Sequence, residues 1–290
     1  MHFMMLGHDL AKGPGRYRSG PIYVHDDESG RVVHEGADAD DVPRLMAELT
    51  REIGRDTAVD PLVRGAMAHL NLVMIHPFLD GNGRMARALQ TLVRSRCGVG
   101  EPAFSSIEEW LGRNTGDYYG VLAATGRGRW QPDGDAALWV KFNLRAHHMQ
   151  AQTTSRRFRE AAAIWTALDE LAAQHGLPDR VIDELYDATI GFRLRRATYV
   201  KRTRIEERTA SRDLGRLSDL GLLRPVGETK GRHYVAGPAL ERMRAERVPA
   251  RRPLEDPSPG LRAEFVAAQD TPDAGALRVV PLRSWADTAP

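Results

Sequence analysis

His76-Pro77-Phe78-Leu79-Asp80-Gly81-Asn82-Gly83-Arg84, followed by Met85-Ala86-Arg87, is the stretch on which the fold depends. One helical pattern leads into it and another leads out of it. Upstream, Asp60-Pro61 is typical of a helix cap followed by a first-position proline, and apolar residues then recur at helical spacing as far as Met74. Because Pro77 disfavours helix at the preceding residue, this helix is predicted to end with His76 at its tip.

Gly81-Asn82-Gly83 is predicted to open the second helix, whose apolar stripe begins at Met85. Free N–H groups at a helix start bind anions, and glycines let a phosphate approach the backbone. Arg84 and Arg87 lie three residues apart in the first turn, where two cations oppose the helix dipole. This placement is favourable when an anion occupies the site.

Asp80 and His76 supply two further groups that phosphate chemistry uses. A carboxylate just before the turn could hold Mg²⁺ against phosphate oxygens. His76 is able to take a proton near neutral pH. Taken singly, these residues fit a helix cap, a turn and solvated charges equally well. Taken together, they suggest phosphoryl or nucleotidyl transfer.

The stretch resembles the Fic family signature, His-x-Phe-x-(Asp/Glu)-Gly-Asn-Gly-Arg-x-x-Arg, at every fixed position, and the resemblance covers roughly residues 1–150. Fic proteins are mostly helical, and most characterised members transfer AMP from ATP to a protein hydroxyl. The resemblance implies that His76 is the base that activates the target hydroxyl, that Asp80 binds Mg²⁺ and that Phe78 anchors the core. It further implies a set of nucleotide-binding residues: Asp80, Gly81, Asn82, Gly83, Arg84 and Arg87.

Two short β-prone runs, Ile22-Tyr23-Val24 and Arg31–His34, flank turn-forming residues and predict a β-hairpin. The resemblance implies that this hairpin is a flap that binds the target segment by strand addition. The alternative is a plain surface hairpin. Tyr118 and Tyr119 follow a segment similar to one near the family's adenine pocket. They are candidate contacts to the base, and an ordinary aromatic core contact is the alternative.

One branch of the family carries a self-inhibitory helix with the pattern Ser/Thr-x-x-x-Glu-Gly/Asn, whose glutamate pairs with the second arginine of the signature. This chain has no recognisable match. Ser105–Glu109 resembles the start of the pattern, but Trp110 follows where the pattern requires Gly or Asn. We therefore expect Arg87 to be available to the γ-phosphate and the chain to be constitutively competent. The abrupt, helix-like start at Met1 leaves an inhibitory helix further upstream as the alternative.

The segment 193–232 is strongly basic, with 12 Lys or Arg residues against five Asp or Glu. Its pattern predicts a winged helix-turn-helix, with helices at Ala197–Thr203 and from Arg208, and a wing turn at Gly227–Gly231. Such a module could bind DNA through phosphate contacts and groove insertion. Alternatively, it serves protein docking or dimerisation. The candidate DNA contacts are Arg208, Ser211, Arg212 and Arg216.

Composition narrows the class of protein. The hydrophobic fraction of 42% is ample for a core, and no run of 18 apolar residues predicts a membrane span. The N-terminus shows no signal pattern, and the single cysteine, Cys97, excludes an internal disulfide and a Cys-based zinc site. A cytoplasmic protein is the resulting expectation.

The predicted fold class is mainly α, with a Fic-type helical domain bearing a β-hairpin flap and a small winged helix-turn-helix. The predicted domains are residues 1–150, a connecting helix at 151–180, the winged helix at 181–247 and a loosely structured tail at 248–290. The predicted activity is AMP transfer from Mg-ATP to a Ser, Thr or Tyr hydroxyl of a protein, this protein included. The resemblance implies that Gly83 favours AMP transfer, because the family's phosphate-transferring branch tends to lack a glycine at this position. A homodimer is a possible assembly of this protein. The rival is a DNA-binding transcriptional regulator whose Fic domain senses nucleotide.

Overall fold

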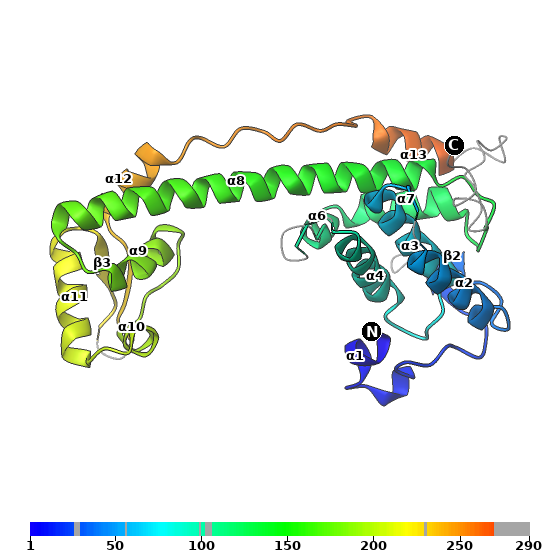
Figure 1. Cartoon of the computed structure of the whole chain (residues 1–290), viewed down its shortest axis with the longest axis horizontal. Helices are drawn as coiled ribbons and strands as arrows, with labels where there is room; N and C mark the ends of the chain where they lie inside the picture. The colour runs from blue at the N-terminus through cyan, green and yellow to red at the C-terminus, as the bar shows by residue number, and fades with distance from the viewer. Residues whose placement is uncertain (26–29, 56, 99, 102–105, 229–230, 270–290) are drawn as a thin grey trace. The chain divides into compact units, whose positions relative to one another are not determined.

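The computed structural model describes residues 1–25, 30–55, 57–98, 100–101, 106–228 and 231–269. It divides into two compact units, of which the first is Met1–Gln152 with Leu254–Pro290 and the second is Thr153–Pro253 (Figure 1). The first unit contains the stretch from His76 to Arg87. Each unit is described by itself.

The first unit is mostly helical, as the sequence predicts. Its helices are α1 (His2–Leu6), the 3-10 helix η1 (Leu10–Lys12), α2 (Val42–Gly54), α3 (Pro61–Ile75), α4 (Asn82–Arg96), α6 (Glu108–Arg113), α7 (Thr115–Gly126), the first part of α8 (Ala137–His175) and α13 (Leu261–Gln269).

Helices α3 and α4 pack against each other and enclose the motif loop. The Asp60 carboxylate accepts a hydrogen bond from the N–H of Leu62 at 2.7 Å, and Pro61 is the first helical residue. The helix ends at Ile75, and His76 caps it in the left-handed conformation, with φ of 53°. The predicted start and end of this helix are therefore confirmed.

The predicted hairpin is also confirmed. Strands β1 (Tyr23–His25) and β2 (Val32–Glu35) pair antiparallel, with Tyr23 opposite Glu35 and Val24 opposite His34. Residues 26–29 of its predicted turn lie outside the described residues. The N–H of Glu35 donates to the carbonyl of Gly128, so the loop after α7 supports the outer side of β2.

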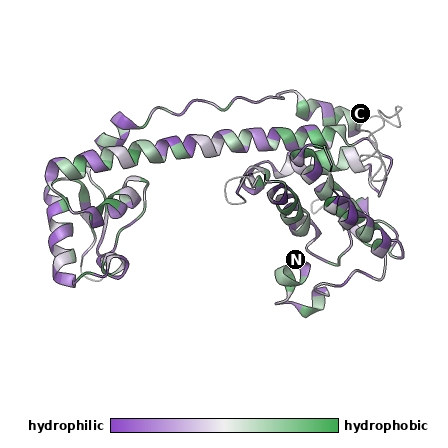
Figure 2. Cartoon of the chain, viewed as in Figure 1, coloured by the Kyte–Doolittle hydropathy of each residue, from purple (hydrophilic) through white to green (hydrophobic). Residues whose placement is uncertain are grey.

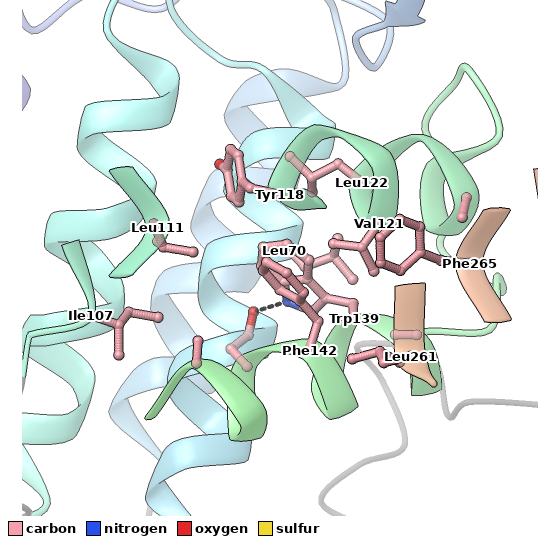
Figure 3. Packing of buried hydrophobic residues seen from close by; sticks show 14 of the residues in the cluster. Leu70, Ile107, Leu111, Tyr118, Val121, Leu122, Trp139, Phe142, Leu261 and Phe265 are labelled. Carbon is pink, nitrogen blue, oxygen red and sulfur yellow. Dashed lines mark hydrogen bonds between the residues drawn. The ribbon is translucent and has the colours of Figure 1, made fainter. Parts of the chain in front are cut away.

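The core of the first unit is aromatic, and Trp139 and Phe142 of α8 are fully buried in it. The indole Nε1–H of Trp139 donates to the carbonyl of Ala66 at 2.7 Å, which fixes α8 against α3. Leu261 and Phe265 of α13 enter the same cluster, where Figure 3 shows Phe265 beside Val121. The prediction of a loosely structured tail over 248–290 is therefore wrong for Leu261–Gln269, because these two apolar side chains dock on α7 and α8.

The second unit contains the last part of α8, the 3-10 helix η2 (Asp179–Val181), α9 (Ile182–Thr189), α10 (Arg196–Thr203), α11 (Glu207–Asp219), the antiparallel strands β3 (Leu223–Val226) and β4 (His233–Ala236), and α12 (Pro238–Arg247). Ala210, Leu214 and Leu217 of α11 are buried, as their spacing predicts. These elements follow the order expected of a winged helix-turn-helix, and that assignment stays a prediction. Thr229 and Lys230 of the predicted wing turn lie outside the described residues.

The docking of α13 depends on a glycine of α7. A Cβ added at Gly120 lies 2.8 Å from Cε2 of the buried Phe265 ring, whereas a Cβ at Gly116 meets nothing within 4 Å. Ala otherwise favours a helix interior over Gly by about 1 kcal/mol. We expect Gly120→Ala to release α13 and speed hydrogen exchange in Leu261–Gln269, and Gly116→Ala to leave that exchange unchanged. Equal exchange in both variants would contradict the packing.

Candidate active site

The C-terminal end of α3 is held by the buried guanidinium of Arg18. Its Nε–H donates to the carbonyl of His76 at 2.7 Å, and Nη2–H donates to that of Ile75 at 3.2 Å. The remaining donors reach the carbonyls of Gly20, at 2.7 Å, and Ala37. Arg18 therefore joins the helix end to the two chain segments at the base of the hairpin. Burial lowers the pKa of this guanidinium, against the opposing effect of Asp38.

His76 is oriented by its own helix. Its Nδ1 lies 3.0 Å from the carbonyl oxygen of Val73. Because that oxygen can only accept, Nδ1 carries the proton and Nε2 keeps its lone pair. Burial lowers the pKa of His76 to about 4, and the neighbouring His34 and Arg18 act in the same direction against the Val73 hydrogen bond. The imidazole is therefore neutral at physiological pH, with Nε2 as its basic atom.

Asn82 holds the loop between the two helices closed. Its buried side chain accepts from the N–H of Phe78 at 3.0 Å and donates to the Phe78 carbonyl at 2.7 Å. The side chain of Asn82 is thus committed to the loop, which leaves its backbone N–H for an anion. On the other side, His2 stacks on the Phe78 ring with centroids 3.7 Å apart and donates from Nε2 to the carbonyl of Asp80.

Asp80 faces the first turn of α4. One oxygen accepts from the N–H of Gly81 at 2.6 Å, and the other lies 3.3 Å from Lys12 Nζ and 3.5 Å from Arg84 Nη2. Partial burial acts to raise the pKa of this carboxyl, but the Gly81 hydrogen bond and the two cations outweigh it and hold the pKa below its ordinary value. Asp80 is therefore ionised and half exposed.

The N-terminus of α4 meets the conditions for a phosphate cradle. Gly81 caps the helix at φ of 79° with no side-chain hydrogen bond, so the first N–H groups of α4 point outward without a side-chain acceptor in the described residues. A Cβ at Gly83 would meet only the Arg87 guanidinium, at 3.5 Å. The backbone here is accessible, and one methyl group would occupy the approach to it.

Arg87 is engaged rather than free. Its Nε–H donates to the Glu108 carboxylate at 2.8 Å, and its guanidinium also hydrogen-bonds the hydroxyl of Tyr118. The expectation that Arg87 is free, because the chain has no match to the inhibitory pattern, is therefore wrong in this structure. No local sequence pattern reveals this pair, because Arg87 and Glu108 lie on different helices, α4 and α6, and are 21 positions apart.

The two tyrosines of the predicted adenine contact have different environments. Tyr118 is buried, and its hydroxyl lies 3.0 Å from His69 Nε2. It is therefore an aromatic core residue, which was the alternative to a contact with the adenine base. Its pKa is raised by burial. Tyr119 is exposed and stacks edge-on against Tyr118, with centroids 5.2 Å apart. Of the pair, Tyr119 is the one at the surface.

The flap residues lie close to His76. A Cβ at Gly36 would lie 2.7 Å from Ile22 Cγ2 and 3.1 Å from His76 Cβ, so the hairpin base packs closely against the start of the His76 side chain. Tyr23 is exposed, and Val24 is half-buried. The sheet contains β1 and β2 alone among the described residues, so the outer edge of β1 has no strand beside it.

The structure thus brings His76, Asp80, Arg84, Arg87 and the flap base together within the first unit. The candidate DNA contacts belong to the second unit, where Arg208, Ser211, Arg212 and Arg216 are all exposed on α11. Arg216 also donates to the carbonyl of His175. The sequence did not identify Arg18, His2 or Glu108 as residues of the site. Arg18, for example, lies 58 positions from His76 in the chain, and no sequence pattern links the two.

The described residues contain neither a candidate metal-binding cluster nor a candidate membrane-spanning helix. No group of three or more His, Cys, Asp or Glu side chains gathers in metal-binding geometry there. None of the helices in those same ranges combines the length and apolar composition that a bilayer span requires. Asp80 is the carboxylate of the motif loop that could hold a metal ion.

Several known proteins are similar to this chain in sequence. A Caenorhabditis elegans protein named protein adenylyltransferase fic-1 is 31% identical over 138 residues, which are 46% of this chain and 24% of that protein. The Caenorhabditis briggsae protein of the same name is 34% identical over 134 residues, with the same two shares. Protein adenylyltransferase Fic of Nematostella vectensis is 31% identical over 134 residues, 46% of this chain and 28% of that protein. This chain therefore spans about a quarter of the length of these relatives.

Among solved structures, a Fic family protein from Desulfovibrio desulfuricans G20 aligns with 82% of this chain and 66% of its own. The identity is 25% and the TM-score is 0.45. The model of the Fic/DOC family matches residues 1–93, which hold the hairpin, the motif loop and most of α4.

Proposed function

We propose that the first unit transfers AMP from Mg-ATP to a hydroxyl group of a protein. The observation that carries this proposal is the orientation of His76, whose Nδ1–H is bound to Val73 and whose Nε2 is left as a base beside an open helix N-terminus. The relatives named protein adenylyltransferase support the same reaction.

In this reaction, His76 Nε2 accepts the proton of the target hydroxyl as its oxygen attacks the α-phosphorus of ATP. The bond from the α-phosphorus to the bridging oxygen breaks, and pyrophosphate leaves. The N–H groups that open α4, with Arg84 and Arg87, stabilise the negative charge on the leaving group. A low-pKa imidazole is a weak base, and a bound triphosphate opposes the effect of Arg18 by adding negative charge nearby.

Asp80 is the residue that would hold Mg²⁺. Its carboxylate is ionised and half exposed, and its present partners are Lys12 and Arg84. One carboxylate with phosphate oxygens and waters is an ordinary environment for this ion. When bound, the ion neutralises phosphate charge.

The target segment is proposed to lie along the outer edge of β1. The backbone groups on that edge can extend the two-stranded sheet by one strand. The hairpin base over His76 would then bring a Ser, Thr or Tyr hydroxyl of the added strand to the imidazole. The substrate class follows from this geometry as an extended protein segment, which includes a segment of this protein.

Replacing His76 tests the reaction directly. We expect His76→Ala to lower AMP transfer about 10²–10⁴-fold, because a general base is lost, while Mg-ATP affinity changes little. The measurement is intact-mass detection of AMP addition, with calorimetric titration of Mg-ATP. His25→Ala, on the exposed part of the hairpin, is the matched histidine control. A wild-type rate in His76→Ala would exclude His76 as the base.

The pH dependence provides an independent test. Because the pKa of His76 is lowered from 6.5 to about 4, the neutral, basic form persists down to that pH and is lost only as the pH falls through it. We expect kcat/KM for the wild-type chain to show no His76 titration between pH 6 and 8. A profile that falls with an apparent pKa near 6.5 and is absent in His76→Ala would contradict this environment.

Glu108 controls the availability of Arg87 in this structure. A carboxylate beside the γ-phosphate position repels a triphosphate and competes for the same guanidinium. We expect Glu108→Gln to tighten Mg-ATP binding about 3- to 10-fold, which corresponds to roughly 1 kcal/mol for a half-exposed ion pair. Glu101→Gln is the control at an exposed acid. Unchanged or weaker binding in Glu108→Gln would show that Glu108 orients Arg87 instead of restraining it.

A second candidate function belongs to the second unit, which we propose binds DNA through α11. Figure 2 colours α11 largely hydrophilic, and Arg208 and Arg212 are exposed on it. We expect the full chain to bind a mixed-sequence duplex with an affinity that falls steeply with salt. Arg212→Ala should reduce the salt slope by about 0.9, measured by fluorescence anisotropy, and Arg51→Ala in α2 should not. Equal slopes for all three proteins would exclude α11 as the contact surface.

A further inference from the structure

Arg87 of α4 has two hydrogen-bond partners of different kinds. Its Nε–H donates to the Glu108 carboxylate at 2.8 Å, and this carboxylate is charged and half exposed. Its guanidinium also donates to the hydroxyl oxygen of Tyr118, which is buried. Burial raises the pKa of the Tyr118 phenol, so this second partner is uncharged.

The two partners respond differently to a bound triphosphate. Phosphate groups repel the Glu108 carboxylate and compete with it for the guanidinium. The neutral hydroxyl of Tyr118 is not repelled by phosphate charge, and it leaves the positive charge of Arg87 uncancelled. The bond between Arg87 and Tyr118 is therefore able to persist while Glu108 is exchanged for phosphate.

The hydrogen bonds behind Tyr118 take their direction from a backbone carbonyl group of α8. The Trp139 carbonyl oxygen can only accept, and Asn143 donates to it from Nδ2 at 3.0 Å, which leaves Asn143 Oδ1 as an acceptor. Gln90 donates from Nε2 to this Oδ1 at 3.0 Å. Gln90 Oε1 is thereby assigned as an acceptor as well.

His69 continues the chain from Gln90 to Tyr118. Gln90 Oε1 lies 2.7 Å from His69 Nδ1, so Nδ1 carries the proton of the imidazole. Burial lowers the pKa of His69 to about 4, against the opposing Gln90 hydrogen bond, so the ring is neutral at physiological pH. Its Nε2 therefore accepts a hydrogen bond from the Tyr118 hydroxyl, 3.0 Å away. The Tyr118 oxygen then offers Arg87 lone pairs alone, as an acceptor.

This chain makes Tyr118 a fixed acceptor. Asn143, Gln90 and His69 are buried and belong to α8, α4 and α3, three helices of the same unit. Hydrogen bonds in such a chain polarise and strengthen one another, so a phenol that donates its own proton accepts more strongly. Arg87 therefore has one fixed partner inside the unit and one exchangeable partner at its surface.

We propose that Tyr118 is a positioning residue of the proposed nucleotide site, whose hydroxyl oxygen holds the Arg87 guanidinium in place while the terminal phosphates of Mg-ATP replace Glu108. The proposal rests on the proposed function, in which Arg87 stabilises the pyrophosphate leaving group. Tyr118 acts through Arg87 and touches no substrate. Removing its hydroxyl therefore weakens Mg-ATP binding, whereas removing the charge of Glu108 strengthens it.

Tyr118→Phe removes one oxygen atom and keeps the ring in the core. We expect this variant to bind Mg-ATP about 3- to 10-fold more weakly than the wild-type chain, by calorimetric titration. Its affinity for AMP, which lacks the leaving-group phosphates, should be unchanged. Tyr186→Phe, on α9 of the second unit, is the matched tyrosine control and should alter neither affinity. Equal weakening of Mg-ATP and AMP binding in Tyr118→Phe would show a packing role alone and overturn the proposal.

A double-mutant cycle tests whether Tyr118 acts through Arg87. Two residues that work through one contact have non-additive effects, whereas independent residues have additive ones. We expect Tyr118→Phe to weaken Mg-ATP binding in the wild-type background and to have no further effect in the Arg87→Ala background. The same fold-change in both backgrounds would contradict the proposed role.

His69 supplies a second pair of variants that decides the proposal even if Tyr118→Phe fails to fold. His69→Gln keeps an amide oxygen that can accept from the Tyr118 hydroxyl, whereas His69→Leu has no acceptor. We expect His69→Leu to weaken Mg-ATP binding several-fold and His69→Gln to restore most of the affinity. Equal Mg-ATP affinities of these two variants would overturn the proposal.

A measurement without nucleotide separates this proposal from the proposed function. NMR relaxation of the Arg87 Nε–H group reports its motion on the picosecond to nanosecond timescale. We expect this motion to increase in Tyr118→Phe and to stay at the wild-type level in Tyr186→Phe. Unchanged motion in Tyr118→Phe would overturn the positioning role alone. A wild-type chain that binds Mg-ATP but adds no AMP to protein would overturn the proposed function, while the motion of Arg87 still decides the role of Tyr118.

Discussion

The site depends on one buried cation, Arg18, and the carbonyl groups that surround it. The last carbonyls of a helix lack partners within the helix and must find donors elsewhere. At the end of α3 that donor is Arg18, which bonds the carbonyls of Ile75 and His76 and at the same time those of Gly20 and Ala37. Hydrogen bonds to charged groups contribute about 1.5–3 kcal/mol each, so this arrangement fixes the hairpin base to the helix end that bears His76. The proposed catalytic base and the proposed target-binding strand are thereby fixed to each other.

At the end of α3 the helix dipole favours the cation Arg18. In the first turn of α4, by contrast, cations gather where the helix dipole disfavours them. Arg84 faces Asp80, and Arg87 faces Glu108. Each arginine therefore has a carboxylate partner that a phosphate group can replace. Asn82 closes the loop with its side chain, so the backbone N–H groups of α4 stay directed outward while the loop cannot open. A rigid loop with exchangeable counter-charges suits a site that binds and releases a polyanion.

Behind this turn, a row of hydrogen-bonded polar side chains runs through the interior of the first unit. His69, Gln90, Tyr118 and Asn143 are all buried, and each has a hydrogen-bond partner that completes a continuous chain. A buried polar group without a hydrogen-bond partner costs folding free energy, whereas a fully hydrogen-bonded network makes the core rigid and favours one packing arrangement. Gln90 belongs to the same helix as Arg87, and the guanidinium of Arg87 bonds the Tyr118 hydroxyl, so this chain reaches the proposed nucleotide site.

The sequence by itself determined the local features. Proline and cap chemistry predicted the ends of α3, β-prone runs predicted the hairpin, and the signature from His76 to Arg87 indicated the similarity to the Fic/DOC family, whose model matches residues 1–93. The spacing of Ala210, Leu214 and Leu217 likewise gave the buried face of α11. Each of these follows from interactions between residues a few positions apart, which a single sequence displays.

Only the tertiary structure decided which distant residues meet. Arg18 reaches His76 across 58 positions, and Glu108 reaches Arg87 across 21, through packing of whole elements. The proline-rich tail contains α13 because Phe265 fits over Gly120, a contact between segments more than 140 residues apart in the chain. Tyr118 lies inward and Tyr119 outward because α7 turns one of two neighbouring side chains toward His69. Such contacts depend on how helices pack, and packing is a property of the folded chain that no local pattern encodes.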